Sequence, residues 1–166
     1  MSANLHAPPR TPACLCVLTT AALINVGPIV QAAEVPSYCA ELKQIAALAL
    51  ARDKFAGIIG AAREGNFRDS KITLPGWGDC SFYGTATYTC DSQGFNTADE
   101  GNAAHGKVLE EVKSCLRGAW TEDESRASPG YVVLHDERQR ASITINTDLT
   151  EKGEHVVRLI LFLRSR

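Results

Sequence analysis

The sequence lacks an excess of charge of either sign, and it lacks a hydrophobic run long enough to span a bilayer. Its 17 Lys and Arg residues nearly balance its 19 Asp and Glu residues, for a formal net charge of −2. Surfaces that bind nucleic acid or anionic membranes are strongly basic, so neither partner is expected. The main apolar run, residues 13–24, contains Thr19 and Thr20 and is shorter than the roughly 20 residues of a membrane span.

Several motifs of enzymes and metal sites are also missing. The sequence has no Gly-x-Ser-x-Gly nucleophile motif, no Gly-rich phosphate loop, no His-Glu-x-x-His and no EF-hand spacing. No two cysteines have Cys-x-x-Cys spacing, which disfavours a zinc site as the alternative use of these residues. We therefore expect no metal and no cofactor.

What is present is the composition of one globular domain. Of the 166 residues, 45% are hydrophobic and 22% are charged, with 13 Gly and 7 Pro. These values exclude a collagen-like, low-complexity or charge-driven disordered chain. The six cysteines are the most informative residues, because their use depends on the compartment of the protein.

Residues 1–32 have the layout of a secretory signal peptide. Arg10 is their only formal charge, the apolar run follows it, and Val30 and Ala32 suit positions −3 and −1 of a cleavage site after Ala32. An uncleaved membrane anchor is the alternative, but polar residues and a proline interrupt the run. After cleavage we expect no insertion into a membrane.

Cleavage leaves residues 33–166 as a single domain, and two of the six cysteines leave with the signal peptide. The four that remain are Cys39, Cys80, Cys90 and Cys115. An even number of cysteines in an exported chain indicates disulfides formed in an oxidising compartment. We therefore expect a periplasmic or secreted protein.

The hydrophobic periodicity predicts two main helices and about five strands. The first helix is expected over residues 37–52, with a short continuation to 59. The second follows a Thr97-Ala98-Asp99-Glu100 capping box. A hairpin is predicted within residues 79–91, and strands over 131–136, 141–147 and 156–163. Residues 71–74 have the pattern of a further short strand, whereas 61–69 and 121–129 have that of surface loops.

Alternation of side chains in the hairpin predicts its register. Cys80 and Phe82 alternate with polar residues before Gly84, as do Tyr88 and Cys90 after it. Residues directly opposite each other point to the same face. A three-residue loop, 84–86, therefore places Phe82 opposite Tyr88 and Cys80 opposite Cys90.

Two more cysteines lie on the apolar stripes of the predicted helices. Cys39 is near the beginning of the first helix, and Cys115 is near the end of the second. Antiparallel helices on one sheet face bring these ends together. Four cysteines allow three pairings, of which we predict Cys39–Cys115 with Cys80–Cys90.

Together these elements predict an α+β fold, in which two helices pack on one face of an antiparallel sheet of about five strands, in the order α-β-β-α-β-β-β. Residues 156–163 are apolar on both faces, which is typical of a central strand. The pattern of Cys39, Leu74-Pro75-Gly76 followed by Cys80, Tyr88-Thr89-Cys90 and Cys115-Leu116 resembles small exported bacterial proteins of unknown function. This resemblance implies a fold and a compartment, and it implies no activity.

The candidate catalytic residues are His135, Asp136 and Glu137, because a histidine beside carboxylates can act as a general acid or base. Neighbouring residues of a strand point to opposite faces, however, so His135 and Asp136 are not expected to converge. His105 is expected to be a partly exposed residue at the boundary of the helix stripe, and His155 a turn residue.

The candidate binding residues are aromatic side chains in or next to loops: Trp77, Tyr83, Phe95 and Trp120. Aromatic residues often anchor partners, although rings in such positions also cap a core. A second candidate surface is a basic patch formed by arginines of the last strands and the turn before them: Arg138, Arg140, Arg158, Arg164 and Arg166. Solvated strand edges are the alternative interpretation of these arginines.

Two hypotheses about function follow. The first is an exported, non-enzymatic binding or interaction module, such as an inhibitor of a secreted enzyme or an envelope accessory protein, whose partner is a protein or a small molecule. The second is a small hydrolase that uses His135 with Asp136 or Glu137. The disulfide-bonded domain without a convergent catalytic motif favours the first.

The disulfide prediction can be tested directly. Peptide mapping of the oxidised protein without reductant should yield one peptide that joins Cys39 to Cys115 and another that joins Cys80 to Cys90. Free thiols in an oxidised preparation, or a peptide that joins Cys39 to Cys80, would refute the predicted pairing.

Overall fold

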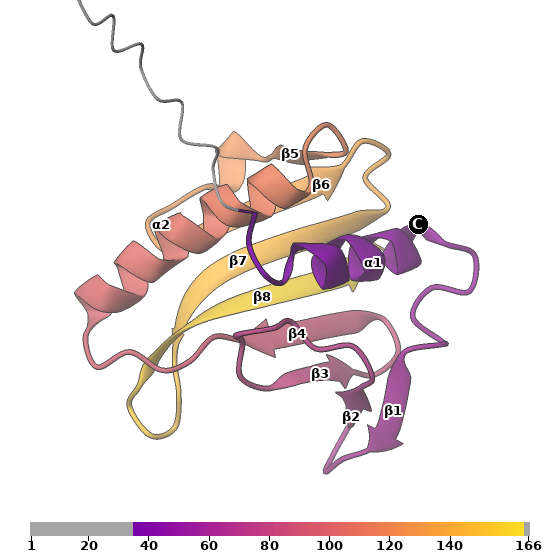
Figure 1. Cartoon of the computed structure of the whole chain (residues 1–166), viewed down its shortest axis with the longest axis horizontal. Coiled ribbons are helices and arrows are strands. Elements are labelled where there is room, and N and C mark those ends of the chain that lie inside the picture. The colour runs from indigo at the N-terminus through magenta and orange to yellow at the C-terminus, as the bar shows by residue number, and fades with distance from the viewer. Residues whose placement is uncertain (1–34, 165–166) are drawn as a thin grey trace, which may run out of the picture. The chain divides into compact units, whose positions relative to one another are not determined.

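Two α-helices lie on the same face of one antiparallel sheet (Figure 1). The computed structural model describes residues 35–164, so the expected signal peptide, residues 1–32, lies outside the described residues. Helix α1 spans Cys39–Leu50, helix α2 spans Ala98–Cys115, and a short 3-10 helix, η1, spans Glu124–Arg126. The α+β class predicted from the sequence is confirmed.

The sheet has eight strands in the described part of the chain, and the last of them lies in its middle. Their order across the sheet is β1-β2-β3-β4-β8-β7-β6-β5. All neighbouring strands are antiparallel. The strands are β1 Ile59–Ala62, β2 Phe67–Ser70, β3 Cys80–Tyr83, β4 Thr87–Asp91, β5 Trp120–Glu122, β6 Tyr131–Asp136, β7 Ala141–Leu149 and β8 His155–Leu163.

Strand β8 occupies the central position that its sequence predicts. It pairs with β4 on one side and with β7 on the other. On the face below the helices, Val157, Leu159 and Leu161 are fully buried and belong to the core cluster. The opposite face carries Arg158 and Ile160, which are only partly buried. The sheet therefore has one apolar face under the helices and one face of mixed polarity, which we call the open face.

Helix α2 begins at the predicted capping box. Thr97 Oγ1 accepts a hydrogen bond from the Glu100 backbone N–H at 3.2 Å, and the Glu100 carboxylate accepts one from the Thr97 N–H at 3.1 Å. This pair of bonds satisfies two backbone donors that a helix start would leave free. Helix α1 begins at Cys39 without a side-chain cap.

The two disulfides of the described chain join the same pairs as predicted. Cys39 at the start of α1 is bonded to Cys115 at the end of α2, 76 residues away. Cys80 of β3 is bonded to Cys90 of β4. All four cysteines are at most 5% exposed, so both bonds lie within the core.

The register of the β3–β4 hairpin also agrees with the prediction. Phe82 lies opposite Tyr88, and Cys80 lies opposite Cys90. The loop contains Gly84 at φ +61°, a left-handed conformation that glycine adopts without steric cost. Phe82 and Tyr88 are fully buried and their ring centroids are 5.4 Å apart, which anchors the hairpin in the core.

The expected number of about five strands is too low, and the expected order of elements along the chain matches only in part. Strands β1, β2 and β5, of four, four and three residues, replace parts of the expected loops 61–69 and 121–129. Strands β1 and β5 are the two edges of the sheet, and β2 lies next to β1. None of the residues of these three strands is buried, so their sequences carry no alternating apolar pattern. Pairing with β3 and β6 makes them strands, and single-sequence periodicity does not report such pairing.

Residues 71–74 and 53–58 also differ from expectation. No strand covers residues 71–74. Their backbone groups form hydrogen bonds with side chains instead. The Leu74 N–H donates to Cys80 Sγ at 3.5 Å, and Tyr88 Oη donates to the Ile72 carbonyl at 3.2 Å. Residues 53–58 form turns, and β1 begins at Ile59. The apolar residues of both segments pack on the core as irregular chain.

Two histidines also differ from expectation. His105, expected at a partly exposed boundary, is 6% exposed. One of its ring nitrogens, Nε2, is 3.1 Å from the Ile145 carbonyl oxygen of β7. His155, expected in a turn, begins β8 and forms a bridge with Phe95. In both cases the sheet supplies a backbone partner that the local sequence does not reveal.

The two faces of β3 should respond differently to truncation. Phe82→Ala removes a fully buried ring and is expected to lower the free energy of unfolding by about 3–5 kcal/mol. Tyr83→Ala changes the adjacent residue, which points to the other face and is 52% exposed, and should cost less than about 1.5 kcal/mol. Urea unfolding measures both, and equal losses would contradict the assignment of faces.

Candidate functional site

The open face of the sheet carries a groove. It has a volume of about 540 Å³, within the range of small-molecule sites. We call it the open-face groove. Its lining comes from β2, β3, β4 and β8 and from the loops next to them: Arg63, Glu64, Phe67, Asp79, Ser81, Tyr83, Thr87, Thr89, Asp91, Arg158 and Ile160.

Strand alternation aims these side chains into the groove. In β3 and β4, Cys80, Phe82, Tyr88 and Cys90 point into the core. The residues between them must point to the open face, because successive side chains of a strand alternate. The same rule that buries the disulfide therefore builds the groove.

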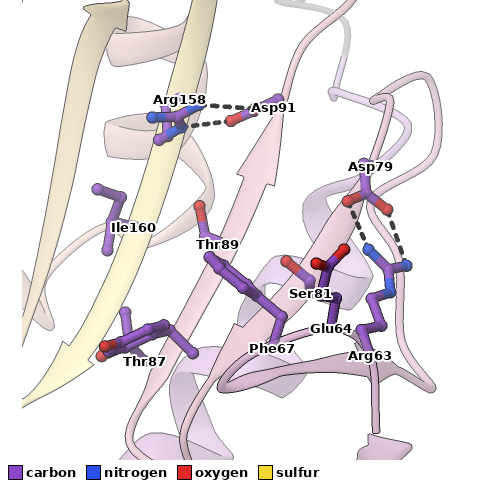
Figure 2. Close-up of a pocket in the computed structure, with 11 residues that line it drawn as sticks. Arg63, Glu64, Phe67, Asp79, Ser81, Thr87, Thr89, Asp91, Arg158 and Ile160 are labelled. Carbon is purple, nitrogen blue, oxygen red and sulfur yellow. Dashed lines mark hydrogen bonds and ion pairs between the residues drawn. The ribbon is translucent and has the colours of Figure 1, made fainter. Parts of the chain in front are cut away.

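Arg63 forms an ion cluster at one side of the groove. Its guanidinium donates to both carboxylate oxygens of Asp79, at 2.7 and 3.0 Å, and to Asp69 at 2.5 Å. Figure 2 shows the paired bonds to Asp79. These hydrogen bonds raise the pKa of Arg63 above its ordinary value, with Asp79 the largest cause. The cluster is exposed, so its ion pairs contribute little to the stability of the fold.

Arg158 forms a matching cluster at another side. Its guanidinium donates to the two oxygens of Asp91 at 2.6 and 2.9 Å, as Figure 2 shows, and it also donates to Asp148. The bonds to Asp91 are the main reason why the pKa of Arg158 is raised. Each arginine of the groove is thus held between two carboxylates.

The hydroxyls of Thr87, Thr89 and Ser81 also line the groove (Figure 2), although Ser81 is only 4% exposed. The Glu64 carboxylate lines it as well. Phe67 and Tyr83 form an edge-to-face aromatic pair, with ring centroids 5.3 Å apart. Their residues are 44% and 52% exposed. The groove thus combines hydroxyls, exposed aromatic rings, two arginines that are paired with carboxylates, and the further carboxylate of Glu64.

The four aromatic residues predicted as binding residues do not lie together. Tyr83 lines the open-face groove, whereas Trp77 and Phe95 line a separate cavity of about 420 Å³. Trp120 lines a third, of about 330 Å³, between the ends of the two helices. The three locations cannot form one site, so only Tyr83 belongs to the groove.

The cavity beside Trp77 contains a buried tyrosine. Tyr38 packs edge-on against Trp77, at 5.7 Å between ring centroids, and donates to the Glu111 carboxylate at 2.8 Å. Burial is the main reason why the pKa of Tyr38 is raised, and the nearby Glu111 adds to it. This hydroxyl stays protonated and links the start of α1 to α2.

The predicted basic patch is divided in the structure. Arg158 belongs to the open-face groove. Arg138, Arg140 and Arg164 line a different cavity of about 450 Å³, beside the end of α1. Arg166 lies outside the described residues. Arg158 is therefore not part of one surface with the other three.

His135 meets residues other than the two carboxylates proposed from the sequence. Its Nδ1 is 2.7 Å from Ser142 Oγ, and its Nε2 is 3.1 Å from Asp123 Oδ2. Asp136 points away and accepts bonds from the backbone N–H groups of Arg138 and Ala141, at 3.1 and 2.7 Å. It shapes the β6–β7 turn.

The arrangement around His135 resembles a catalytic triad only in composition. Asp123, His135, Asp136 and Glu137 line one polar cavity of about 340 Å³. Ser142 is fully buried, so its Oγ cannot reach a substrate. Both ring nitrogens of His135 are within hydrogen-bond distance of protein groups, Ser142 and Asp123. The contacts connect the chain before η1 to the sheet.

Comparisons with protein-family models, with curated proteins and with solved structures find no match to this chain. The groove must therefore be interpreted from its own chemistry.

In residues 35–164, no three His, Cys, Asp or Glu residues form a cluster that could hold a metal ion. Neither α-helix there is long and apolar enough to cross a membrane.

Sequence reasoning missed most of the groove. The outward set of β4, Thr87 and Thr89, follows from the predicted hairpin register. Arg63 and Phe67 lie within residues 61–69, which the sequence predicts to be a surface loop, so it does not predict that they lie near β3. The pairing of Arg158 with Asp91 depends on β8 lying beside β4, 67 residues apart in sequence, and no local pattern reports it.

The Asp123 carboxylate gives a pH-dependent prediction. Ser125 Oγ donates to it at 2.6 Å, and this bond, followed by the bond from His135, lowers the pKa of Asp123. Because the folded state favours the carboxylate, the loop is stabilised above the ordinary aspartate range, and this contribution is lost as pH falls through the lowered value.

Ser125→Ala should therefore raise the pKa of Asp123 toward its ordinary value. Carbon-13 NMR titration of the side-chain carboxyl measures this. Ser128→Ala is the matched control, since Ser128 lies in the same segment and forms a backbone bridge to Tyr131. An unchanged Asp123 titration in Ser125→Ala would show that this hydrogen bond is not formed.

Proposed function

We propose that this protein is an exported, non-enzymatic binding module that holds its ligand in the open-face groove. The groove itself carries the proposal. Segments far apart in the sequence build a cavity of about 540 Å³, with exposed rings at one wall and hydroxyls in its lining. Cavities with a few convergent polar groups are the usual sites of ligand binding.

The rigidity of the walls supports this role. The Cys80–Cys90 disulfide joins β3 to β4 directly beneath the groove, and β4 is paired with β8 along its whole length. Side chains that project from paired strands are already positioned before a ligand arrives. Such preorganisation reduces the ordering cost of binding.

The cysteines support export. All four cysteines of residues 35–164 are paired, and disulfides persist in oxidising compartments. The signal-peptide layout of residues 1–32 and the resemblance to small exported bacterial proteins point to the same place. We accordingly propose a periplasmic or secreted location.

A small hydrolase based on His135 is the second candidate function. Its support is the Asp123 carboxylate, which is in contact with the imidazole inside a cavity. The geometry favours it less, because Ser142 is inaccessible and, among the described residues, the ring is in hydrogen-bond contact with Ser142 and Asp123 and not with Asp136 or Glu137. A test of the groove must therefore also be able to detect a site in the His135 cavity.

Blocking the groove tests the proposal. Thr89→Arg places a long side chain on the groove floor and should abolish retention of the native ligand. The wild-type protein and the variant, each immobilised, are exposed to the envelope fraction of the native host, and released molecules are identified by mass spectrometry. We expect a species that wild type retains and Thr89→Arg loses.

Thr121→Arg is the matched control. Thr121 is also a threonine on a strand, it is exposed, and it lines the His135 cavity at the other end of the sheet. It should retain the ligand. Loss of the ligand in Thr121→Arg but not in Thr89→Arg would move the site to the His135 cavity and overturn the proposal. Thermal unfolding of each variant verifies that it is folded.

A further inference from the structure

We infer that the ligand of the open-face groove is a neutral saccharide. This inference rests on the proposed function and adds the chemical class of the ligand. Three properties of the groove lead to it: the pairing of its charges, the hydroxyls of its floor, and the exposed aromatic pair at its wall.

The pairing of charges disfavours charged ligands. Arg63 lies between Asp69 and Asp79, and Arg158 lies between Asp91 and Asp148. An anionic ligand would approach carboxylates that outnumber the guanidiniums. A cationic ligand would have to compete with an arginine at every carboxylate of the two clusters, and only Glu64, which also lines the groove, lies outside them. A neutral ligand disturbs neither cluster.

The same carboxylates can still accept hydrogen bonds. An ionised carboxylate has about four lone-pair sites, and the bidentate contact with Arg63 uses one on each oxygen of Asp79. Hydroxyl donors can therefore bond to Asp79 and Asp91 without breaking the ion pairs. Bonds of this kind are charge-assisted and stronger than bonds between neutral groups.

The floor of the groove complements such a ligand. Ser81, Thr87 and Thr89 carry hydroxyls that both donate and accept. A polyhydroxyl ligand also presents donors and acceptors close together. Burying these groups against each other leaves few unpaired, and unpaired groups would otherwise weaken binding.

The aromatic pair supplies the apolar part. Phe67 and Tyr83 keep about half of their surface exposed, which is more than core packing would leave. A pyranose ring has an apolar C–H face between its equatorial hydroxyls, and such a face packs on an aromatic ring. Rings that adjoin hydroxyls and paired carboxylates thus match the two kinds of surface of a sugar.

Solution NMR with sugars that differ in charge tests the inference. The probes are chitotetraose, cellotetraose, maltotetraose, xylotetraose and mannotetraose, which are neutral, together with the cationic chitosan tetramer and the anionic tetragalacturonate. At millimolar concentration we expect at least one neutral probe to shift amide signals of β3, β4 and β8. The charged probes should bind at least about tenfold more weakly.

Variants connect the binding to the proposed contacts. Tyr83→Ala should lower the affinity for the neutral probe by up to about tenfold, the loss expected for one aromatic contact. Tyr83→Phe should retain most of that affinity. Trp120→Ala changes an aromatic residue of another cavity and should have no effect. The dispersion of the amide spectrum verifies the fold of each variant.

Three outcomes would overturn the inference: no neutral probe binds, a charged probe binds as tightly, or the shifted signals lie away from the groove. Its failure can be told apart from failure of the proposed function. If a species other than a saccharide, such as a peptide, is retained by wild type and lost by Thr89→Arg, the groove is still the binding site and only the ligand class is wrong.

Discussion

The alternation of side chains across the paired strands β3, β4 and β8 is the constraint on which the rest of the structure depends. Each strand gives one set of residues to the helix-covered core and the other set to the open face. Because side chains alternate with a period of two, a shift of the strand register by one residue would exchange the core-facing set and the open-face set. The same pairing that buries the Cys80–Cys90 disulfide therefore presents Thr89 and Tyr83 to the groove.

This constraint explains why the protein has a stable scaffold and an unfilled surface at once. The helices cover one face, and the Cys39–Cys115 disulfide connects them at their ends. In the described chain no α-helix covers the other face beside β3 and β4. The arginine–carboxylate clusters lie there in partial contact with water, where their contribution to folding is small and their geometry is available for a ligand.

The histidine cluster illustrates how composition can mislead without geometry. The imidazole of His135 contacts both a serine and an aspartate, which is the composition of a hydrolytic triad. The serine is fully buried, so the contacts are better explained as support for the chain before η1. The open-face groove, by contrast, has accessible side chains, among them Phe67 and Tyr83, which are 44% and 52% exposed.

The amino-acid sequence by itself determined the elements with strong periodicity: the capping box at Thr97, the register of the hairpin, the central position of β8 and the two disulfide pairs. In each case the information is local or follows from alternation. Only the tertiary structure determined the short strands β1, β2 and β5 and the groove. Strand β2 is a strand because β3 pairs with it, and Arg158 meets Asp91 because β8 returns to β4. Such contacts depend on chain segments far apart in sequence, and no local pattern encodes them.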